Sequence, residues 1–252
     1  MVSWKQNTIE EIVDSESKMI FQWEKLYGAY FHNAWKLNSL LNNFLKSVDK
    51  PQNFLFIAFL SQIKKHHTLA LFSALRQHHI QTGMMLRQVI EATSWAIYAL
   101  WNTDEDLFFA KRPSWAIFVP DKLDVQKNKW LAVNFPEKTI EFKKIKTLIN
   151  DSVAHCDIVY TFQNFDPSSI AKWEFYTPFF DITDEYKVKS DLWFVANVII
   201  GVLDLFYGAN LKYWVFQFVD DFLLVFQSLV KENNDLKTEM MKHPRFIKVT
   251  EL

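Results

Sequence analysis

An arginine and a glutamate one helical turn apart, Arg87 and Glu91, have the spacing that points most directly to chemistry. Side chains at positions i and i+4 of a helix meet on one face and pair readily. A buried pair of this kind can be a structural tie between helices, because an unpaired buried charge is costly. Alternatively, Arg87 can hold a phosphate or carboxylate while Glu91 orients it. We favour the structural interpretation, and the functional one stays open.

A histidine in the segment NDSVAHCD, His155, lies where a predicted helix ends and a β-like segment begins. Protonated histidine is stabilised at a helix C-terminus, and an imidazole there can also act as a general acid or base. The guanidinium of Arg87 has five N–H donors, more than the carboxylate of Glu91 can accept. Asp151, Ser152 or a bound anion near His155 would accept the others. We therefore predict that any polar site forms where Arg87, Glu91 and His155 converge.

The other histidines and the single cysteine do not form a metal-site pattern. Two metal ligands on one helix need i and i+4 spacing, which no pair has among His66, His67, His78 and His79. We expect these to be satisfied core or groove histidines. The single cysteine, Cys156, excludes an intramolecular disulfide and a zinc site built from several cysteines. We therefore expect neither a metal nor a cofactor, and the cysteine content fits a reducing cytoplasm.

The long stretch from Ile57 to Trp101 would position most of these residues. It contains no proline and one glycine, Gly83, and its apolar residues recur at helical spacing in two stripes. We predict the central helix of a bundle, either continuous or bent at Gly83. An unbroken helix adds Arg76 and Tyr98 to the candidate binding residues, because one face then carries Arg76, Ile80, Gly83, Arg87, Glu91, Ser94 and Tyr98.

Proline, glycine and charged residues divide the rest of the chain into further elements. These are one or two helices over 8–48, an irregular insertion over 102–136 with a short helix from Asp121 to Val133, a helix from Pro136 to about His155, a β-hairpin of Ile158–Phe162 and Trp173–Phe180, helices over 186–207 and 211–233, and a loosely held tail over 236–252. The predicted fold class is mainly α. It is a single-domain bundle over 1–252 with five to seven long helices and one small hairpin near residues 158–180.

Composition sets limits on the partners. A net charge of -1 and a sequence pI near 6.7 give no global basic field for nucleic acid. The polar, acidic N-terminus shows no signal peptide, so we expect a cytoplasmic protein. The nearest match to a membrane span, Leu192 to Asn210, is interrupted by Asp204, so we expect buried core helices and no membrane. Aromatic residues between Leu192 and Leu229 predict a homodimer that buries part of them.

The segment HTLALFSALRQHHIQTGMMLRQVIEATSWAIYAL resembles the core helix of HEPN-like bacterial proteins of unknown function, in which an Arg-x-x-x-Glu pair lies in an apolar helix. A later Ser-x-x-His element of those proteins is similar to Ser152-Val-Ala-His155. The resemblance covers about Phe54 to Cys156 and, more weakly, the two C-terminal helices. It implies an all-helical, often dimeric bundle. Many members of the wider HEPN superfamily are metal-independent RNases in defence systems.

The catalytic signature of those RNases is an arginine followed four to six residues later by a histidine. This chain departs from that pattern, because no arginine lies within that distance before His155 and Lys146 lies nine positions before it. The resemblance therefore implies first a non-catalytic HEPN-like binding or interaction protein, linked to defence or stress response. One alternative is an RNase with RNA or a nucleotide as partner, its cation coming from Arg87 or Arg76. Another is a helical pocket for a small apolar ligand around Met84, Met85 and Trp95.

Overall fold

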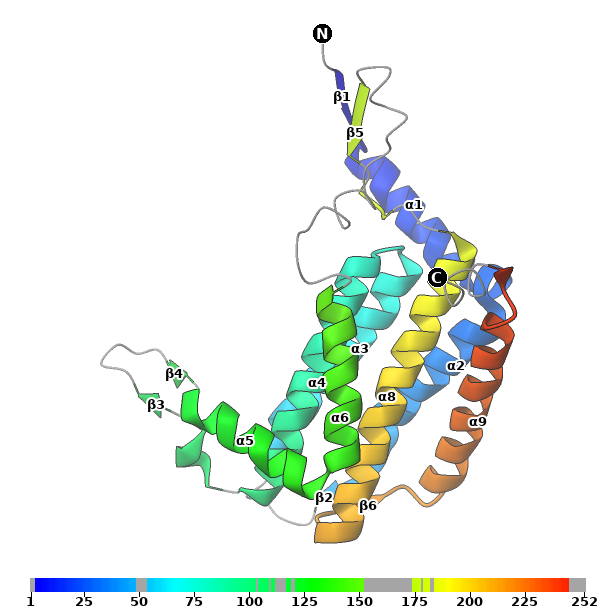
Figure 1. Cartoon of the computed structure of the whole chain (residues 1–252). Helices are drawn as coiled ribbons and strands as arrows, with labels where there is room; N and C mark the ends of the chain where they lie inside the picture. Colours follow the sequence, from blue (N-terminus) through cyan, green and yellow to red (C-terminus); the bar gives the residue numbers. More distant parts are fainter. Residues whose placement is uncertain are drawn as a thin grey trace.

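A computed structural model of the 252-residue chain is mainly α (Figure 1). It describes residues 3–48, 54–102, 104–108, 110–111, 117–118, 121–151, 174–177, 179–181 and 184–244. Within these ranges there are eight α-helices and a 3-10 turn, η1, at Glu105–Leu107. The α-helices are α1 (Ile9–Phe21), α2 (Trp23–Asn43), α3 (Phe54–Leu75), α4 (His79–Trp101), α5 (Asp121–Asn134), α6 (Pro136–Ile149), α8 (Glu185–Tyr213) and α9 (Phe222–Met240).

Local capping signals explain where several helices begin. Thr8 and Glu11 form a reciprocal capping box at the start of α1, which satisfies two backbone N–H groups. Pro136 occupies the first turn of α6, where its missing N–H costs nothing. The carboxylate of Asp184 caps α8 by accepting from the backbone N–H of Lys187. The predicted helix starting at Asp121 and the one starting at Pro136 are both confirmed.

The prediction of one central helix from Ile57 to Trp101 is wrong. The stretch forms two helices, α3 and α4, which pack side by side as a hairpin (Figure 1). The break is at Gln77, whose φ of 58° is left-handed, and the N–H of His78 donates to the Ser73 carbonyl at 2.9 Å. Gly83, the expected bend, is buried inside α4. Arg76 therefore does not share a helix face with Arg87.

The helix at the centre of the bundle is α8, which contacts α2, α3, α4, α6 and α9. Its side chains Leu192, Val195 and Phe206 have no exposed surface. The Phe206 ring lies 5.6 Å from that of Phe44 and 5.8 Å from that of Phe56, in the offset and edge-to-face geometries that aromatic rings prefer. By length and hydropathy α8 could cross a membrane, and 61% of its most apolar window is buried within the chain.

Three short strand pairs lie at the periphery. Strand β2 (Leu45–Val48) pairs antiparallel with β6 (Phe216–Phe218), and β3 (Ala110–Lys111) pairs antiparallel with β4 (Ile117–Phe118). The second strand of the predicted hairpin overlaps β5 (Glu174–Thr177). However, β5 pairs in parallel with the N-terminal strand β1 (Ser3–Gln6), so its described partner is not the predicted one. The first predicted hairpin strand, Ile158–Phe162, lies outside the described residues.

The two C-terminal helices extend beyond their predicted ends, and the predicted start of the second at residue 211 is wrong, because α9 begins at Phe222 and strand β6 occupies Phe216–Phe218. Helix α8 continues through Gly208 to Tyr213 and stops where Trp214 adopts a left-handed conformation with φ of 51°. Helix α9 runs to Met240, and both Leu236 and Met240 are buried, so the start of the expected loose tail is packed against the bundle. Much of the aromatic content that motivated the dimer prediction is buried within the chain itself, at Phe206, Phe216, Phe222 and Phe226.

Candidate functional site

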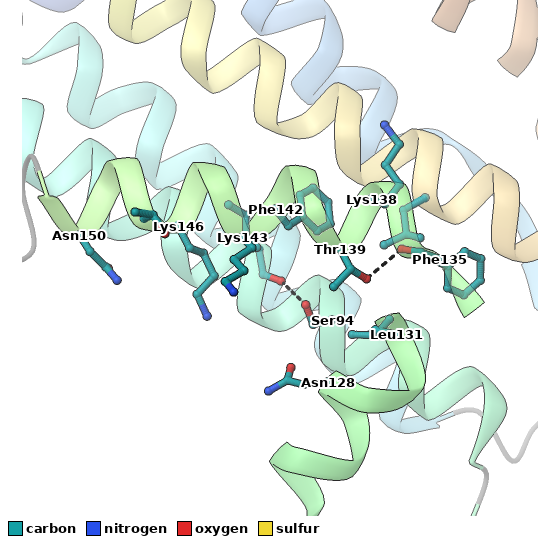
Figure 2. A pocket seen from close by; sticks show the side chains of 13 residues that line it. Ser94, Asn128, Leu131, Phe135, Lys138, Thr139, Phe142, Lys143, Lys146 and Asn150 are labelled. Atoms are coloured by element: carbon teal, nitrogen blue, oxygen red, sulfur yellow. Dashed lines mark hydrogen bonds between the residues drawn. The ribbon is translucent and has the colours of Figure 1, made fainter. Parts of the chain in front are cut away.

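A cavity of about 460 Å³ opens between α4, α5 and α6 and reaches Leu205 of α8 (Figure 2). Its wall comes from four helices: Ile90 and Ser94 on α4, Asn128 and Leu131 on α5, Leu205 on α8, and, on α6 with the residue before it, Phe135, Lys138, Thr139, Phe142, Lys143, Lys146, Thr147 and Asn150 at its end. Such a volume lies within the range of roughly 300 to 1,000 Å³ that small-molecule sites occupy.

The spacing of residues on α6 explains why this helix supplies most of the wall. Thr139, Lys143 and Thr147 recur every four residues and therefore share one face. The neighbouring face carries Phe142 and Ile149, which are buried in the core and fix the helix against the bundle. The packing of Phe142 on α8 is close, because a Cβ added at Gly201 would lie 3.1 Å from its ring.

The two ends of the cavity differ in chemistry. Lys143, Lys146 and Asn150 lie toward one end, whereas Leu131 and Phe135 lie at the other (Figure 2). The cationic end belongs to the C-terminal part of α6, where the helix dipole stabilises positive side chains. A ligand that fills the cavity therefore meets positive charge at one end and an apolar wall at the other.

The predicted pair of Arg87 and Glu91 forms, and a lysine from another helix joins it. The Oε1 atom of Glu91 accepts from Arg87 Nε at 3.2 Å and from Lys146 Nζ at 3.0 Å. Burial raises the pKa of Glu91, but the hydrogen bonds and charges of Lys146 and Arg87 outweigh it and leave that pKa below its usual value. The pair is half-buried: the side chains of Arg87 and Glu91 are 36% and 32% exposed.

The remaining two cavity lysines differ in how their charge is compensated. Lys138 Nζ lies 2.7 Å from Glu141 and 2.9 Å from Asp204, and the side chain points toward α8 (Figure 2). Burial lowers the pKa of Lys138, but these two carboxylates raise it overall. Lys143, by contrast, is exposed and has neither a hydrogen bond nor an ion pair within the described part of the chain. Lys143 is the open cation of the cavity.

Polar groups between the two ends are arranged mainly as acceptors. The hydroxyls of Ser94 and Thr139 donate to the carbonyls of Ile90 at 3.0 Å and Phe135 at 2.8 Å, which leaves their lone pairs for a ligand or water. The Oδ1 atom of Asn150 is buried and has no hydrogen-bond partner among the residues that the structure describes. A buried amide oxygen without a partner is costly, so a donor from a ligand or water would stabilise it.

A buried lysine lies beside the cavity, next in sequence to Asn128. Lys127 is 4% exposed, and its Nζ lies 2.6 Å from Asp124 and 4.0 Å from the centre of the Trp95 ring. Burial lowers the pKa of Lys127, and Asp124 offsets part of that effect. The hydrogen bond from Lys127 in turn lowers the pKa of Asp124. Lys127 and Asp124 were not among the predicted site residues, although their i and i+3 spacing is visible in the sequence.

Among the predicted site residues that the structure describes, Arg87 and Glu91 come together as predicted. Arg76 lies at the α3–α4 turn, where its Nε is 3.9 Å from Glu16. Tyr98 is buried in an aromatic cluster near Trp95, and burial raises its pKa.

The predicted site residues at the end of α6 follow that helix directly. Asp151 is exposed there, and Ser152 and His155 lie outside the described residues, so their convergence with Arg87 stays a prediction. Sequence reasoning missed Lys143 and gave Lys146 no role, although the basic run FKKIK was a signal for both.

The expected core histidine and the expected apolar pocket have different outcomes. His67 is fully buried, with Nδ1 2.8 Å from Asn38 Oδ1 and Nε2 3.3 Å from the Val195 carbonyl, so both ring nitrogens have a neighbour within hydrogen-bond distance. His66 departs from the expectation, because its buried Nδ1 has no hydrogen-bond partner among the described residues. Met84 is exposed and Trp95 packs on Lys127, and neither lines the cavity. Within the described ranges no group of three His, Cys, Asp or Glu side chains is placed to hold a metal ion.

The cavity can hold an anionic group by charge-assisted hydrogen bonds at its lysine end and an apolar group at its other end. A scan against protein-family models and searches of curated proteins and of solved structures found no match to this chain.

Proposed function

We propose that this protein is a non-catalytic, HEPN-like helical binding protein that holds a small organic anion in the cavity between α4, α5 and α6. The observation that carries the proposal is Lys143, a cation that has no ion pair within the described residues and lies at the same end of the cavity as Lys146. A carboxylate or phosphate oxygen there gains charge-assisted hydrogen bonds, which are worth about 1.5–3 kcal/mol each.

Two observations support binding over the RNase alternative. Arg87, one of the two candidate cations for stabilising a cleaved phosphate, already contacts Glu91. Arg76, the other candidate cation, lies at the α3–α4 turn beside Glu16. RNA cleavage lost in both Arg87→Ala and His155→Ala variants that remain folded would restore the RNase alternative. The HEPN-like assignment is supported by the helical fold and by the Arg87–Glu91 contact on α4.

A purely apolar ligand is less well supported than an amphipathic one. Such a ligand would desolvate Lys143 without giving it a hydrogen-bond partner. An anion with an apolar body pairs with Lys143 and packs its apolar part on Leu131 and Phe135. A defence or stress role, a cytoplasmic location and a homodimer remain predictions for this binding protein.

Calorimetric titration of the full chain with a panel of small carboxylates and phosphate esters tests the proposal. We expect at least one anion to bind, and Lys143→Gln to weaken that binding about ten-fold or more, the equivalent of one charge-assisted hydrogen bond. Lys144→Gln is the matched control, because Lys144 is an exposed neighbour on α6 that does not line the cavity. Equal losses in the two variants would show nonspecific electrostatics, and no binding by any anion would overturn the proposal.

A further inference from the structure

The net charge of the side chains around the cavity restricts the charge, and so the chemical class, of its ligand. We infer that the ligand is a monoanion, a carboxylate attached to an apolar body, and that Lys143 supplies the charge that selects it. This inference rests on the proposed anion-binding function of the same cavity.

The first part of the charge count concerns the apolar side of the cavity. Lys138 is held by two carboxylates, with Nζ 2.7 Å from Glu141 and 2.9 Å from Asp204. One cation against two anions leaves this group with one surplus negative charge. Lys138 therefore attracts no further anion, although it lines the cavity.

The second part of the charge count concerns the lysine end of the cavity. Arg87 and Lys146 share the single carboxylate of Glu91, which leaves one surplus positive charge. That surplus balances the negative one around Lys138, so the ion-paired groups of the cavity wall carry no net charge. Lys143, which has no ion pair within the described part of the chain, adds one positive charge. Exposed charges farther out are screened by solvent and contribute less.

The direction of α6 favours a carboxylate over a phosphate as the bound anion. Phosphate groups favour the N-terminal ends of helices, where backbone N–H groups and the positive end of the dipole meet them. Here the cationic end of the cavity lies toward Asn150, at the C-terminal end of α6 (Figure 2). The dipole there opposes part of the positive charge of Lys143. A phosphate ester, with about 1.5 to 2 negative charges at neutral pH, would leave uncompensated negative charge in the site.

The side chains in the middle of the cavity are unfavourable for a ligand that carries further anionic oxygens there. Ser94 and Thr139 have their hydroxyl protons committed to backbone carbonyls, so they present lone pairs to the cavity. Beyond them, Leu131 and Phe135 offer apolar surface. An apolar body extending from a single carboxylate matches this order along the cavity, since its apolar surface is buried against Leu131 and Phe135.

Three ligands of similar size separate the alternatives: phenylacetate, its neutral analogue phenylacetamide, and phenyl phosphate. Calorimetric titration at pH 7.5 and fixed ionic strength should show phenylacetate binding about ten-fold tighter than either of the others, the difference expected for one charge-assisted contact. Lys143→Gln should reduce phenylacetate affinity to that of the amide. Lys144→Gln should leave it unchanged.

A variant with one more positive charge in the cavity also tests whether the charge of the cavity selects a monoanion. Glu91→Gln releases Lys146 and adds one positive charge to the cavity, so we expect the affinity for phenyl phosphate to rise about ten-fold relative to phenylacetate. Circular dichroism checks that each variant is folded. Tighter binding of phenyl phosphate to the unmodified protein, lost in Lys143→Gln, would overturn the monoanion inference and leave the anion site intact. Failure of every anion, the wider panel included, would overturn both.

Discussion

The centre of the bundle and the α4–α5–α6 side bury polar groups in different ways. Around α8 most buried polar side chains are neutral and bind each other: His67 contacts Asn38, and Asn33 donates to Asn233 at 3.0 Å. The charged exception is Asp191 at the N-terminal part of α8, which is paired with Lys187 at 2.9 Å and lies 3.0 Å from His79. On the α4–α5–α6 side the groups are charged. Lys127 is buried there with its charge paired to one carboxylate, whereas other lysines face a cavity.

This difference between the two regions predicts which of them contributes to the stability of the fold and which to ligand binding. A neutral buried group that is hydrogen-bonded to other buried side chains contributes to the fold, and changing it alters stability. A charge that is half-solvated contributes little to stability, and it remains able to bind an ion. We therefore expect changes near α8 to alter the free energy of unfolding, and changes on the α4–α5–α6 side to alter mainly binding.

The largest expected effect is a pH-dependent change in the free energy of unfolding that is due to His67. Burial lowers the pKa of His67 to about 4 from an ordinary value near 6.5, despite the opposing contact with the Val195 carbonyl. Because the folded pKa is lowered, the unfolded chain takes up a proton first as pH falls. The contribution to stability is thus complete above pH 6.5 and is lost toward pH 4, by roughly 3 kcal/mol.

Urea unfolding of the unmodified chain and of His67→Gln between pH 7.5 and 4 measures this contribution. The difference in unfolding free energy between the two proteins should shrink by that amount as pH falls, because the other titrating groups are common to both. His32→Gln is the control, since the His32 side chain is 44% exposed. A constant difference for His67→Gln would mean that the core does accept a charged histidine.

For Lys127→Met we expect a smaller change in the free energy of unfolding, and in the opposite direction, because this substitution stabilises the fold. Methionine retains the packing on Trp95, removes the cost of burying an ammonium group, and leaves Asp124, whose side chain is 54% exposed, in contact with water. We expect the unfolding free energy at pH 7 to rise by about 1 kcal/mol. A loss of similar size would show that the Lys127–Asp124 pair stabilises the fold.

The same substitution also removes a pH effect. Because the folded pKa of Lys127 is lowered, the unmodified protein gains stability as pH rises through that pKa toward the ordinary lysine value. Lys127→Met should lack this gain in thermal unfolding at alkaline pH. An alkaline gain that persists in the variant would assign it to another group.

The smallest effect is expected for Arg87→Met. The pair with Glu91 is about one-third exposed, and Lys146 remains to compensate the carboxylate. Solvent screening limits such pairs to about 0–1 kcal/mol, so denaturant unfolding should change by less than that. A loss above about 2 kcal/mol would support the interpretation of this pair as a structural tie and would weaken the contrast between the two regions.

Local signals in the sequence were sufficient for helix type and several helix starts. The capping box at Thr8, the charge-rich stretch from Asp121 and the proline at 136 each act within one turn of the chain, so their effect is readable without tertiary contacts. The contact between Arg87 and Glu91 is equally local, because i and i+4 spacing brings the side chains together in any helix.

The break at Gln77 had no such signal, since neither proline nor glycine stands there. Contacts from a distant segment support it: the backbone N–H of Asp181 donates to the Gln77 carbonyl at 3.0 Å, and the Asp181 carboxylate accepts from the N–H of Ile80. Folding back at this point also lets the apolar stripes of α3 and α4 pack on each other. Tertiary contacts compensate for an unfavourable backbone conformation that the local sequence does not favour.

Sequence alone determined that this is a mainly α protein in which Arg87 and Glu91 meet on one helix. Only the tertiary structure decided that Lys146 joins them and that Lys143 faces a cavity. Both lysines come from α6, whose position depends on Phe142 packing against Gly201 of α8. Helical spacing fixes which side chains share a face of one helix, whereas the approach of two helices depends on side-chain shapes far apart in the chain.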